Sequence, residues 1–503
     1  MKETTEQIFE PEEAEVITVY PEPEENEERE ITFWYKDGSK LKIDSQSFIK
    51  QLGRLGYRKY KLGKEYVFVY VEKNIVEEVE PVHMKDNIRD FMKNTEREFE
   101  EGITSDKIMG KVINQTPTLF SRGNLEWLEI LENNFNRDKR SESYFYFRNC
   151  FVRVTKGGIT VQNYEELNGL IWKKQIIDSD FQLSETESEF KKFIYLICRG
   201  DEKRYNSFNS VIGYLLNGYK DPANAKAIIF MDEKVDEGAN GGCGKSLLGN
   251  AISRVRQSLR IPGKNFKFDR FSFQSYEPGT NIIEFNDLSK GFPFEMLFTA
   301  ITDNMAFEKK NKDETIVDFK HAPKILLSTN YTIKGVDEST LRRQFILEFS
   351  DYFNIRYTPE MEFKKRFFDD WSEEDWNSFY NFMVGCELYY LQNGLVDYER
   401  VNVDHKKLVE STSEEFVEYM EDIELDKIHD KKATHQKFID TYPDYKNLHQ
   451  KTFTSWVKLY AKLKGLKFEP KKSDAERGFI LSKPEAGRMD ERKTGAAGEG
   501  EIF

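Results

Sequence analysis

A glycine-rich stretch, EGANGGCGKSLLGNAI at residues 237–252, carries the residue types best suited to phosphate chemistry. Closely spaced glycines let backbone N–H groups turn around phosphates at the start of a helix. The Lys245 ammonium would bridge the β- and γ-phosphates, and the Ser246 hydroxyl would ligate Mg²⁺. The expected cofactors are therefore ATP and Mg²⁺. The predicted nucleotide-binding residues are Gly241, Gly242, Cys243, Gly244, Lys245, Ser246 and Leu247.

The flanking segments supply the context that such a loop needs. The run AKAIIFMD at 225–232 has a buried-strand pattern, and KSLLGNAISRVRQSL has apolar residues at helical spacing. One position departs from the G-x-x-x-x-G-K-[ST] pattern, because residue 239 is alanine. Two explanations stay open: Gly238 takes the first glycine's place one residue early, or Ala239 adopts the turn itself.

An ATP-hydrolysing site also needs an acid at the end of a second strand. TNIIEFNDLSKG at 280–291 supplies Asp287, which is predicted to hold the Mg²⁺ shell together with Ser246 or to polarise the attacking water. The alternatives are that Asn286 and Asp287 form only a turn and that Glu284 is an exposed strand residue.

Two later segments complete the set of candidate catalytic residues. APKILLSTNYTIKG at 322–335 reads as a third strand, and Asn330 at its end is suited to orienting water toward the γ-phosphate. STLRRQFILEF at 339–349 places two arginines before another apolar strand, where one could act as an arginine finger. A surface salt bridge is the alternative for these arginines. The predicted catalytic residues are Lys245, Asp287, Asn330, Arg343 and Arg342.

The order of these parts, all between Lys245 and Arg343, resembles superfamily 3 helicases, the compact AAA+-like motors of small DNA viruses, poxvirus-type proteins, phages and plasmids. The most specific match is NMAFEKKNKDETIVDFKHAPKILLSTN at 304–330. In that family this stretch is a hairpin that grips DNA in the central channel of a ring, followed by the sensor Asn. The resemblance therefore implies that Lys309, Lys310 and Lys312 contact DNA phosphates.

By the same resemblance, Asp287 matches the second of two adjacent Walker B acids, and Asn286 stands where the first is expected. Arg343 is the better match to the arginine finger, and Arg342 is the second choice. The family pattern implies a homo-oligomeric ring, most simply a hexamer, acting on single-stranded or forked DNA with 3′ to 5′ polarity. A separate primase or polymerase is an expected partner.

Composition is compatible with this interpretation. The chain has 503 residues, 38% hydrophobic and 14% aromatic, with a net charge of −14, much of it in the acidic first thirty residues. Since charge distribution rather than net charge decides DNA binding, this excess does not exclude it. No run of eighteen apolar residues, no signal-peptide pattern and no metal or disulfide spacing of the four cysteines is present. We expect no membrane partner and a location in the cytoplasm of a bacterial or phage-infected cell.

The expected fold class is α/β, with a central AAA+-like P-loop ATPase domain built on a parallel sheet. A small α/β domain and a mixed helical region are expected before it, and a winged-helix-like domain after it. The predicted divisions are an acidic disordered tail at 1–30, a small α/β domain at 31–84, a mixed, mainly helical region at 85–222, the ATPase core at 223–350, a helical region at 351–430, the winged-helix-like domain at 431–484 and a disordered tail at 485–503.

The segment at 433–482 is predicted to fold as helix, turn, helix and a strand–turn–strand wing. It resembles the terminal winged-helix module of many phage and poxvirus-type helicases, in which the second helix enters the major groove. The predicted DNA contacts are Lys458, Lys462, Lys471 and Lys472. A solvated helix that packs only on its neighbours is the alternative.

The leading hypothesis is an ATP-dependent DNA helicase that unwinds DNA for the replication of a phage, plasmid or integrated mobile element. Two alternatives remain. One is a DNA-binding replication initiator whose nucleotide site does not hydrolyse, which Ala239 and Asn286 would favour. The other is an ATPase that remodels proteins.

Overall fold

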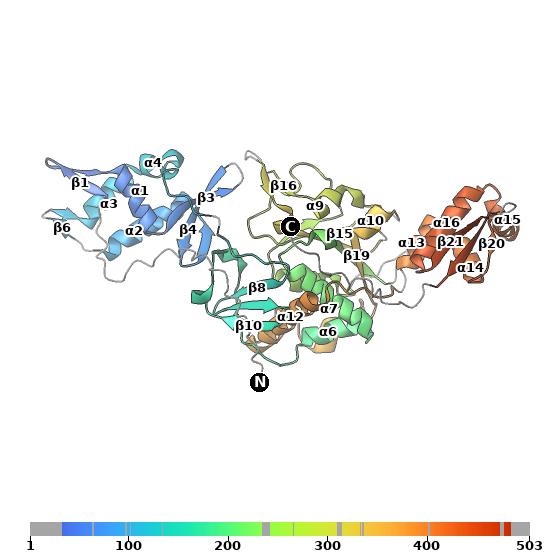
Figure 1. The fold of residues 1–503 in the computed structure, drawn as a ribbon. Helices are drawn as coiled ribbons and strands as arrows, with labels where there is room; N and C mark the ends of the chain where they lie inside the picture. The colour runs from blue at the N-terminus through green and yellow to red at the C-terminus, as the bar shows by residue number, and fades with distance from the viewer. Residues whose placement is uncertain are drawn as a thin grey trace, which may run out of the picture.

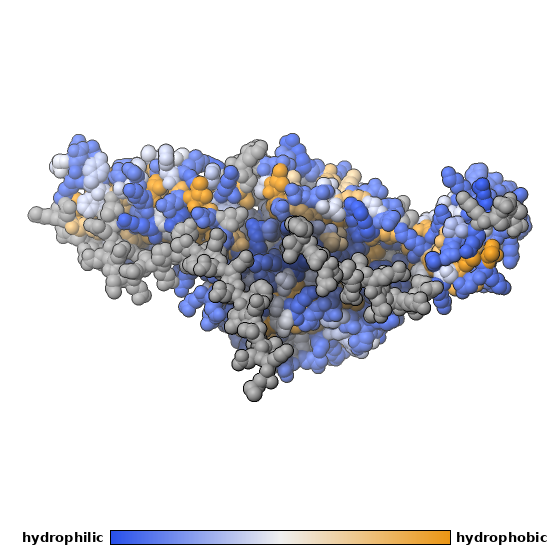
Figure 2. Space-filling view, in the orientation of Figure 1, coloured by the Kyte–Doolittle hydropathy of each residue, from blue (hydrophilic) through white to orange (hydrophobic). Residues whose placement is uncertain are grey.

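The protein consists of three units in an elongated arrangement (Figure 1). We call them the N-terminal unit, the central unit and the C-terminal unit; their described residues begin at 33, 134 and 403, respectively. The computed structural model describes residues 33–62, 65–95, 98–100, 102–132, 134–233, 242–264, 266–308, 314–331, 333, 337–400, 403–472 and 477–483. The face shown in Figure 2 is mainly hydrophilic where it is coloured.

The N-terminal unit mixes short strands and helices around one apolar core that runs from Phe33 to Leu128. An Asp-Gly turn closes the first hairpin: Asp37 pairs with Lys40, and Gly38 takes a φ of 61°, which favours glycine. Its elements are β1 (Trp34–Asp37), β2 (Lys40–Ile43), α1 (Ser45–Arg54), β3 (Tyr57–Leu62), β4 (Glu65–Glu72), β5 (Ile75–Glu78), α2 (Pro81–Asn94), β6 (Glu98–Glu100), β7 (Ile103–Thr104), α3 (Ser105–Asn114), α4 (Thr116–Leu119) and α5 (Arg122–Leu125).

A four-stranded sheet and two helices precede the central sheet. Strands β8 and β9 pair antiparallel, and β10 and β12 extend the pair to the order β10-β9-β8-β12. The short strand β11 instead pairs with β5 of the N-terminal unit and so joins the two units. The elements are β8 (Glu142–Phe147), β9 (Phe151–Thr155), β10 (Gly158–Gln162), β11 (Ile171–Trp172), β12 (Ile176–Ile177), α6 (Glu189–Ile197) and α7 (Glu202–Leu216).

The centre of the protein is a five-stranded sheet in which every pair is parallel, in the order β14-β15-β18-β13-β19. This confirms the predicted parallel α/β sheet and is consistent with a P-loop ATPase core. Strands β13, β18 and β19 are buried throughout, as expected for strands covered on both faces. The elements are β13 (Ala227–Asp232), α8 (Lys245–Ser253), β14 (Ser258–Pro262), β15 (Ile282–Leu288), α9 (Phe298–Thr302), β16 (Met305–Phe307), β17 (Thr315–Val317), β18 (Lys324–Thr329), α10 (Glu338–Arg342) and β19 (Gln344–Phe349).

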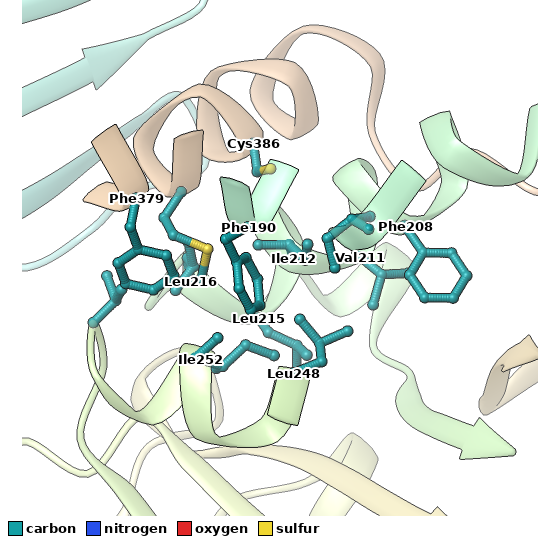
Figure 3. Close-up of a cluster of buried hydrophobic side chains, with 14 of the residues drawn as sticks. Phe190, Phe208, Val211, Ile212, Leu215, Leu216, Leu248, Ile252, Phe379 and Cys386 are labelled. Atoms are coloured by element: carbon teal, nitrogen blue, oxygen red, sulfur yellow. The ribbon is translucent and has the colours of Figure 1, made fainter. Parts of the chain in front are cut away.

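One face of this sheet is covered by helices that come from both sides of it in the sequence. Helices α11 (Pro359–Phe363) and α12 (Glu373–Asn393) follow the sheet, and α12 packs along α7. In the close-up of this core, Leu248 and Ile252 of α8 lie below Leu215 of α7, with Phe379 of α12 beside them (Figure 3). The long helices therefore set the position of α8, the helix that follows the glycine loop.

The C-terminal unit has the element order predicted for 433–482, two helices followed by an antiparallel hairpin. Strand β20 adds to that hairpin in the order β20-β22-β21. Its core also includes Leu408 of α13 and Phe416 of α14. The elements are α13 (Val403–Ser411), α14 (Glu414–Glu421), β20 (His429–Asp430), α15 (Lys431–Thr441), α16 (Gln450–Leu463), β21 (Lys467–Lys472) and β22 (Arg477–Ser482).

Candidate functional site

The glycine loop joins the end of β13 to the start of α8, as the sequence predicts. Gly242 and Gly244 have φ angles of 103° and 101°, which residues other than glycine rarely adopt. A Cβ on Gly244 would also lie 2.6 Å from the ring of Phe193, so the loop has no space for a larger residue there. Gly241 and the variant positions Gly238 and Ala239 lie outside the described residues.

Lys245 is buried, and its ammonium group lies between two oxygens. Its Nζ donates to Oδ1 of Asp232 at 2.5 Å and to Oδ1 of Asn330 at 2.6 Å. Asp232 is the last residue of β13, and Asn330 directly follows β18. The structure thus brings together two predicted site residues that are 85 positions apart in the chain.

Asp232 is a residue that the sequence interpretation did not single out. Its side chain is buried, and Oδ1 also accepts from the thiol of Cys243 at 2.6 Å, while Oδ2 has no partner among the described residues. Burial raises the pKa of Cys243 to about 12, so this thiol stays protonated and can donate. The available signal was an acid in the last position of the strand that precedes the glycine loop.

Asp287 lies on a bulge at the end of β15. Its φ of 56° is unusual for a residue with a side chain, and the pairing of β15 with β18 shifts between Phe285 and Leu288. The side chain is exposed, and the backbone N–H donates to Oγ of Ser328 at 3.2 Å. Asn286 accepts a hydrogen bond from the same Ser328 hydroxyl at 3.0 Å. The bulge therefore directs Asp287 out of the sheet instead of into its core.

Strand register places the candidate residues at one edge of the sheet. Thr329 of β18 pairs with Met231 of β13 and with Leu288 of β15. Asp232, Asn330 and Asp287 are each one residue away from this row. The carboxyl ends of parallel strands are where ligands bind in open α/β sheets.

The donor set at this edge fits Mg²⁺ and a phosphate ligand. Ser246 and Asp287 present exposed oxygens, the kind of ligand that Mg²⁺ prefers, and Lys245 supplies a cation for phosphate. Among the described residues, no group of three or more His, Cys, Asp or Glu could hold a metal by itself. A magnesium ion here would therefore depend on waters and on the nucleotide for its other ligands. Leu247 packs against the core beneath the loop.

Glu284 is not the exposed strand residue that the sequence allowed. It is 3% exposed and accepts from Nε of Arg260 at 2.7 Å. A Cβ on Gly249 of α8 would lie 2.5 Å from Oε1 of Glu284, so this glycine gives the carboxylate its space. Glu284 therefore has a structural ion pair under the helix.

The two arginines lie at the amino-terminal ends of the strands, whereas the glycine loop lies at their carboxyl ends. Gln344, at the start of β19, pairs with Ala227, and the loop side of the sheet is roughly 17 Å further along the strand. Arg343 donates to Oγ of Ser339 at 2.7 Å and lies over the ring of Phe298. Burial, and then the neighbouring Arg342, lower the pKa of Arg343. Arg342 is exposed, and its guanidinium has no hydrogen-bond or ion-pair partner among the described residues.

The predicted lysine hairpin lies in the chain between β15, which contains Asp287, and β18, which leads to Asn330. Strands β16 and β17 pair antiparallel, with Phe307 opposite Thr315. Tyr276 stacks on Phe307 with ring centres 3.7 Å apart and holds the base of the hairpin on the central unit. Lys309, Lys310 and Lys312, which the sequence places between these two strands, lie outside the described residues.

The predicted DNA-contacting lysines of the C-terminal unit have different surroundings. Lys458 of α16 is exposed and lies over the ring of Phe468, and Lys471 is exposed on β21 beside Glu469. Lys462 lines a cleft that faces the central unit. The side chain of Lys472 is not among the described parts of the structure.

Comparisons with known proteins give distant likenesses only. No family model and no curated protein matches the chain. The A form apo structure of the NrS-1 C terminal region is 13% identical over 86% of this chain and 98% of that chain, with a TM-score of 0.38. The A form apo structure of its region 305–718 is 14% identical over 87% and 99%, with a TM-score of 0.37. A JCV helicase is 13% identical over 40% and 53%, with a TM-score of 0.25.

These scores are too low to assign a function, so the proposals below rest on the site itself. Among the described residues, no helix is long and apolar enough to cross a lipid bilayer.

Proposed function

We propose that the chain is an ATP-dependent DNA helicase that works as a ring of identical subunits. The observation that carries the proposal is the meeting of Lys245 and Asn330, 2.6 Å apart, at the same sheet edge as Asp287. A phosphate-binding cation, a water-orienting amide and an exposed carboxylate are the groups that phosphoryl transfer to water requires. Asp287 and Asn330 lie at the carboxyl ends of the neighbouring strands β15 and β18, and Lys245 begins α8, the helix that follows β13.

Each group has a defined task in this proposal. Lys245 leaves Asp232 and binds the β- and γ-phosphates, and the backbone N–H groups around Gly242 and Gly244 surround them. Ser246 and Asp287 would hold a magnesium ion, which would neutralise charge on the phosphates. Asn330 then orients a water molecule toward the γ-phosphate. The thiol of Cys243 keeps Asp232 in place.

The position of the arginines supports completion of the site by a neighbouring subunit. Arg342 and Arg343 are roughly a strand length from the glycine loop of their own subunit. In a closed ring, however, a heterologous interface places this edge of one subunit against a different edge of the next. The exposed Arg342 and the anchored Arg343 are both candidates for the residue that reaches the neighbour's γ-phosphate.

DNA is the proposed substrate because of the hairpin that follows the acid-ended strand. The sequence between its two strands includes EKKNKDE, with three lysines, and lysine contacts to phosphates track a DNA strand without reading its bases. Replication of a phage, plasmid or mobile element, with 3′ to 5′ movement, a hexameric ring and a separate primase, belongs to the same proposal. A forked duplex with a single 3′ or 5′ tail tests the polarity.

The deciding experiment is steady-state ATPase activity with and without single-stranded DNA. We expect DNA to stimulate wild type, and Lys245→Ala to abolish turnover while the variant stays folded. Lys458→Ala, on an exposed face far from the loop in sequence, is the control for turnover without DNA. Robust DNA-independent ATPase with no DNA affinity at moderate salt would instead favour a protein-remodelling ATPase.

A non-hydrolysing replication initiator is the second candidate, and one contact favours it. The position of the first Walker B acid holds Asn286, whose amide oxygen is bonded to Ser328 and carries no charge. Nucleotide binding without measurable turnover in wild type would support this function. Turnover restored by Asn286→Asp would show that the missing acid is the reason.

A further inference from the structure

A cleft of about 380 Å³ lies where the C-terminal unit meets the amino-terminal edge of the central sheet. Lys226 and Gln344 line it from the central unit, and Lys407 and Lys462 line it from α13 and α16. In Figure 1, α13 faces α10 and β19 across this junction. The cleft lies at the amino-terminal ends of the strands and Lys245 lies at their carboxyl ends, so the cleft is separate from the candidate nucleotide site.

Positive charge exceeds negative charge among the residues that line the cleft. Arg400 forms ion pairs with Asp397 at 3.1 Å and Asp404 at 3.5 Å, so both acids of the lining are engaged by one cation. Lys226 and Lys462 add two further positive charges. Burial lowers the pKa of Lys226, and a nearby anion would oppose that effect.

Lys407 adds another cation to the lining and fixes the direction of an amide. Its Nζ donates to Oε1 of Gln344 at 3.0 Å, and because a lysine can only donate, this contact defines which end of the amide is oxygen. Nε2 of Gln344 then has no acceptor among the described residues, and the residue is 6% exposed.

Nε of Arg400 is a second buried donor in this lining without an acceptor in the described part of the chain. Buried donors of this kind call for an acceptor, since leaving one unpaired costs about 1–3 kcal/mol. Lysines together with two unpaired N–H donors make a site for an anion with several acceptor oxygens.

We propose that this cleft binds a phosphate group, carried either by a DNA backbone or by a free polyphosphate. The first of these sources rests on the proposed helicase function, and the second does not. A phosphate held between Gln344 of β19 and Lys462 of α16 would tie the C-terminal unit to the central sheet. Lys462, predicted from the sequence to enter a DNA groove, thus contacts phosphate beside the central unit.

Two variants of the 503-residue chain test the cleft, one by removing a positive charge and the other by adding a negative charge. Lys462→Gln removes an exposed cation, and Gln344→Glu introduces a carboxylate of the same shape where the unpaired donor now lies. Lys451→Gln, exposed on the first turn of the same helix and outside the lining, is the matched control. The first arm measures binding of a fluorescein-labelled 25-nucleotide thymidine strand over a range of salt concentrations. The second measures binding of inorganic tripolyphosphate by calorimetry in a Lys245→Ala background, which removes the other phosphate site.

We expect both variants to bind at least one of the two ligands more weakly than wild type does. We expect Lys451→Gln to bind both ligands as tightly as wild type does. For DNA, loss of one lysine contact should weaken binding roughly threefold and lower the salt slope by about 0.7. Gln344→Glu should weaken DNA binding roughly tenfold, because the new carboxylate and the DNA phosphate are both negatively charged. An effect on DNA alone identifies the backbone as the source, and an effect on tripolyphosphate alone identifies a free polyphosphate.

Two outcomes separate failure of this inference from failure of the proposed function. If wild type does not bind DNA, the helicase proposal fails, and the tripolyphosphate arm still decides the cleft. If both ligands bind both variants as tightly as they bind wild type, the cleft is not a phosphate site. If Lys451→Gln weakened ligand binding as much as the cleft variants do, the inference would also be overturned. The weaker binding would then come from the lower total positive charge of the protein.

Discussion

The ammonium group of Lys245 donates to the carboxylate of Asp232 at 2.5 Å, across the glycine loop that separates them in sequence. Both side chains are buried, and the same carboxylate oxygen accepts from Cys243. A lysine that binds phosphate must give up this ion pair, so Asp232 competes with the nucleotide for Lys245.

Replacing Asp232 with Asn should therefore tighten nucleotide binding. The amide keeps the shape but removes the charge that holds Lys245, so a larger fraction of the protein is ready to bind phosphate, and we expect roughly three- to tenfold tighter binding. A fluorescent ATP analogue measures this. Cys243→Ser, which keeps both Asp232 and the hydrogen bond to it, should stay within about twofold of wild type. Weaker binding by Asp232→Asn would mean that Asp232 aligns Lys245 for the phosphate.

The two arginines should separate in their effects. Arg343 is anchored by Ser339 and lies over Phe298, so Arg343→Ala should lower the melting temperature as well as turnover. Arg342 is exposed, so Arg342→Ala should leave the melting temperature unchanged.

Mixing subunits tests whether either arginine acts on a neighbour. If it does, adding an arginine variant to Lys245→Ala subunits should restore part of the turnover, because some interfaces then combine an intact loop with an intact arginine. No recovery at any ratio, from subunits shown to assemble together, would place the arginine's effect within its own subunit.

Packing of α7 on α12 should tolerate no side chain at Gly213. A Cβ there would lie 2.2 Å from the carbonyl oxygen of Cys386 and 2.5 Å from Cβ of Tyr390, and backbone atoms cannot move aside cheaply. We expect Gly213→Ala to destabilise the protein by about 1–3 kcal/mol or more. Gly385→Ala on α12 has open space around it and should be neutral or stabilising, since alanine favours helices. Thermal melting compares the two, and equal melting temperatures would contradict the close contact.

Lys220 should make stability depend on pH. It is 1% exposed, its Nζ donates to the carbonyl of Ala300 at 2.7 Å, and burial lowers its pKa to about 7. In the unfolded chain a lysine titrates near 10.4. Between these values the unfolded chain binds more protons than the folded chain, so the contribution of Lys220 to stability rises with pH.

The measurement is the change in melting temperature from pH 7 to pH 9. We expect the melting temperature of wild type to rise over this range, and Lys220→Met should reduce the rise by roughly 2–4 °C. Lys320→Met, at an exposed position, should leave the rise unchanged. An unaltered rise in Lys220→Met would mean that Lys220 is charged in the folded protein.

Much of the fold around the site could be predicted from local patterns. The apolar run before the glycine loop is β13, the helical spacing after Lys245 is α8, and the Asp-Gly pair at 37–38 is a hairpin turn. Such features depend on neighbours a few residues away, and their signals are present in a short window of sequence. The position of Asn330 at the end of a strand was predictable for the same reason, whereas its catalytic role stays a prediction.

The sequence by itself determined which residues of this protein could do phosphate chemistry and which strands end in them. Only the tertiary structure decided that Asp232 holds Lys245, that Glu284 is buried against Arg260, and that Lys462 faces the central unit. Each of these contacts joins segments that are distant in the chain, and the choice among several available partners was made by the packing of whole strands and helices. A local pattern contains no information about that packing.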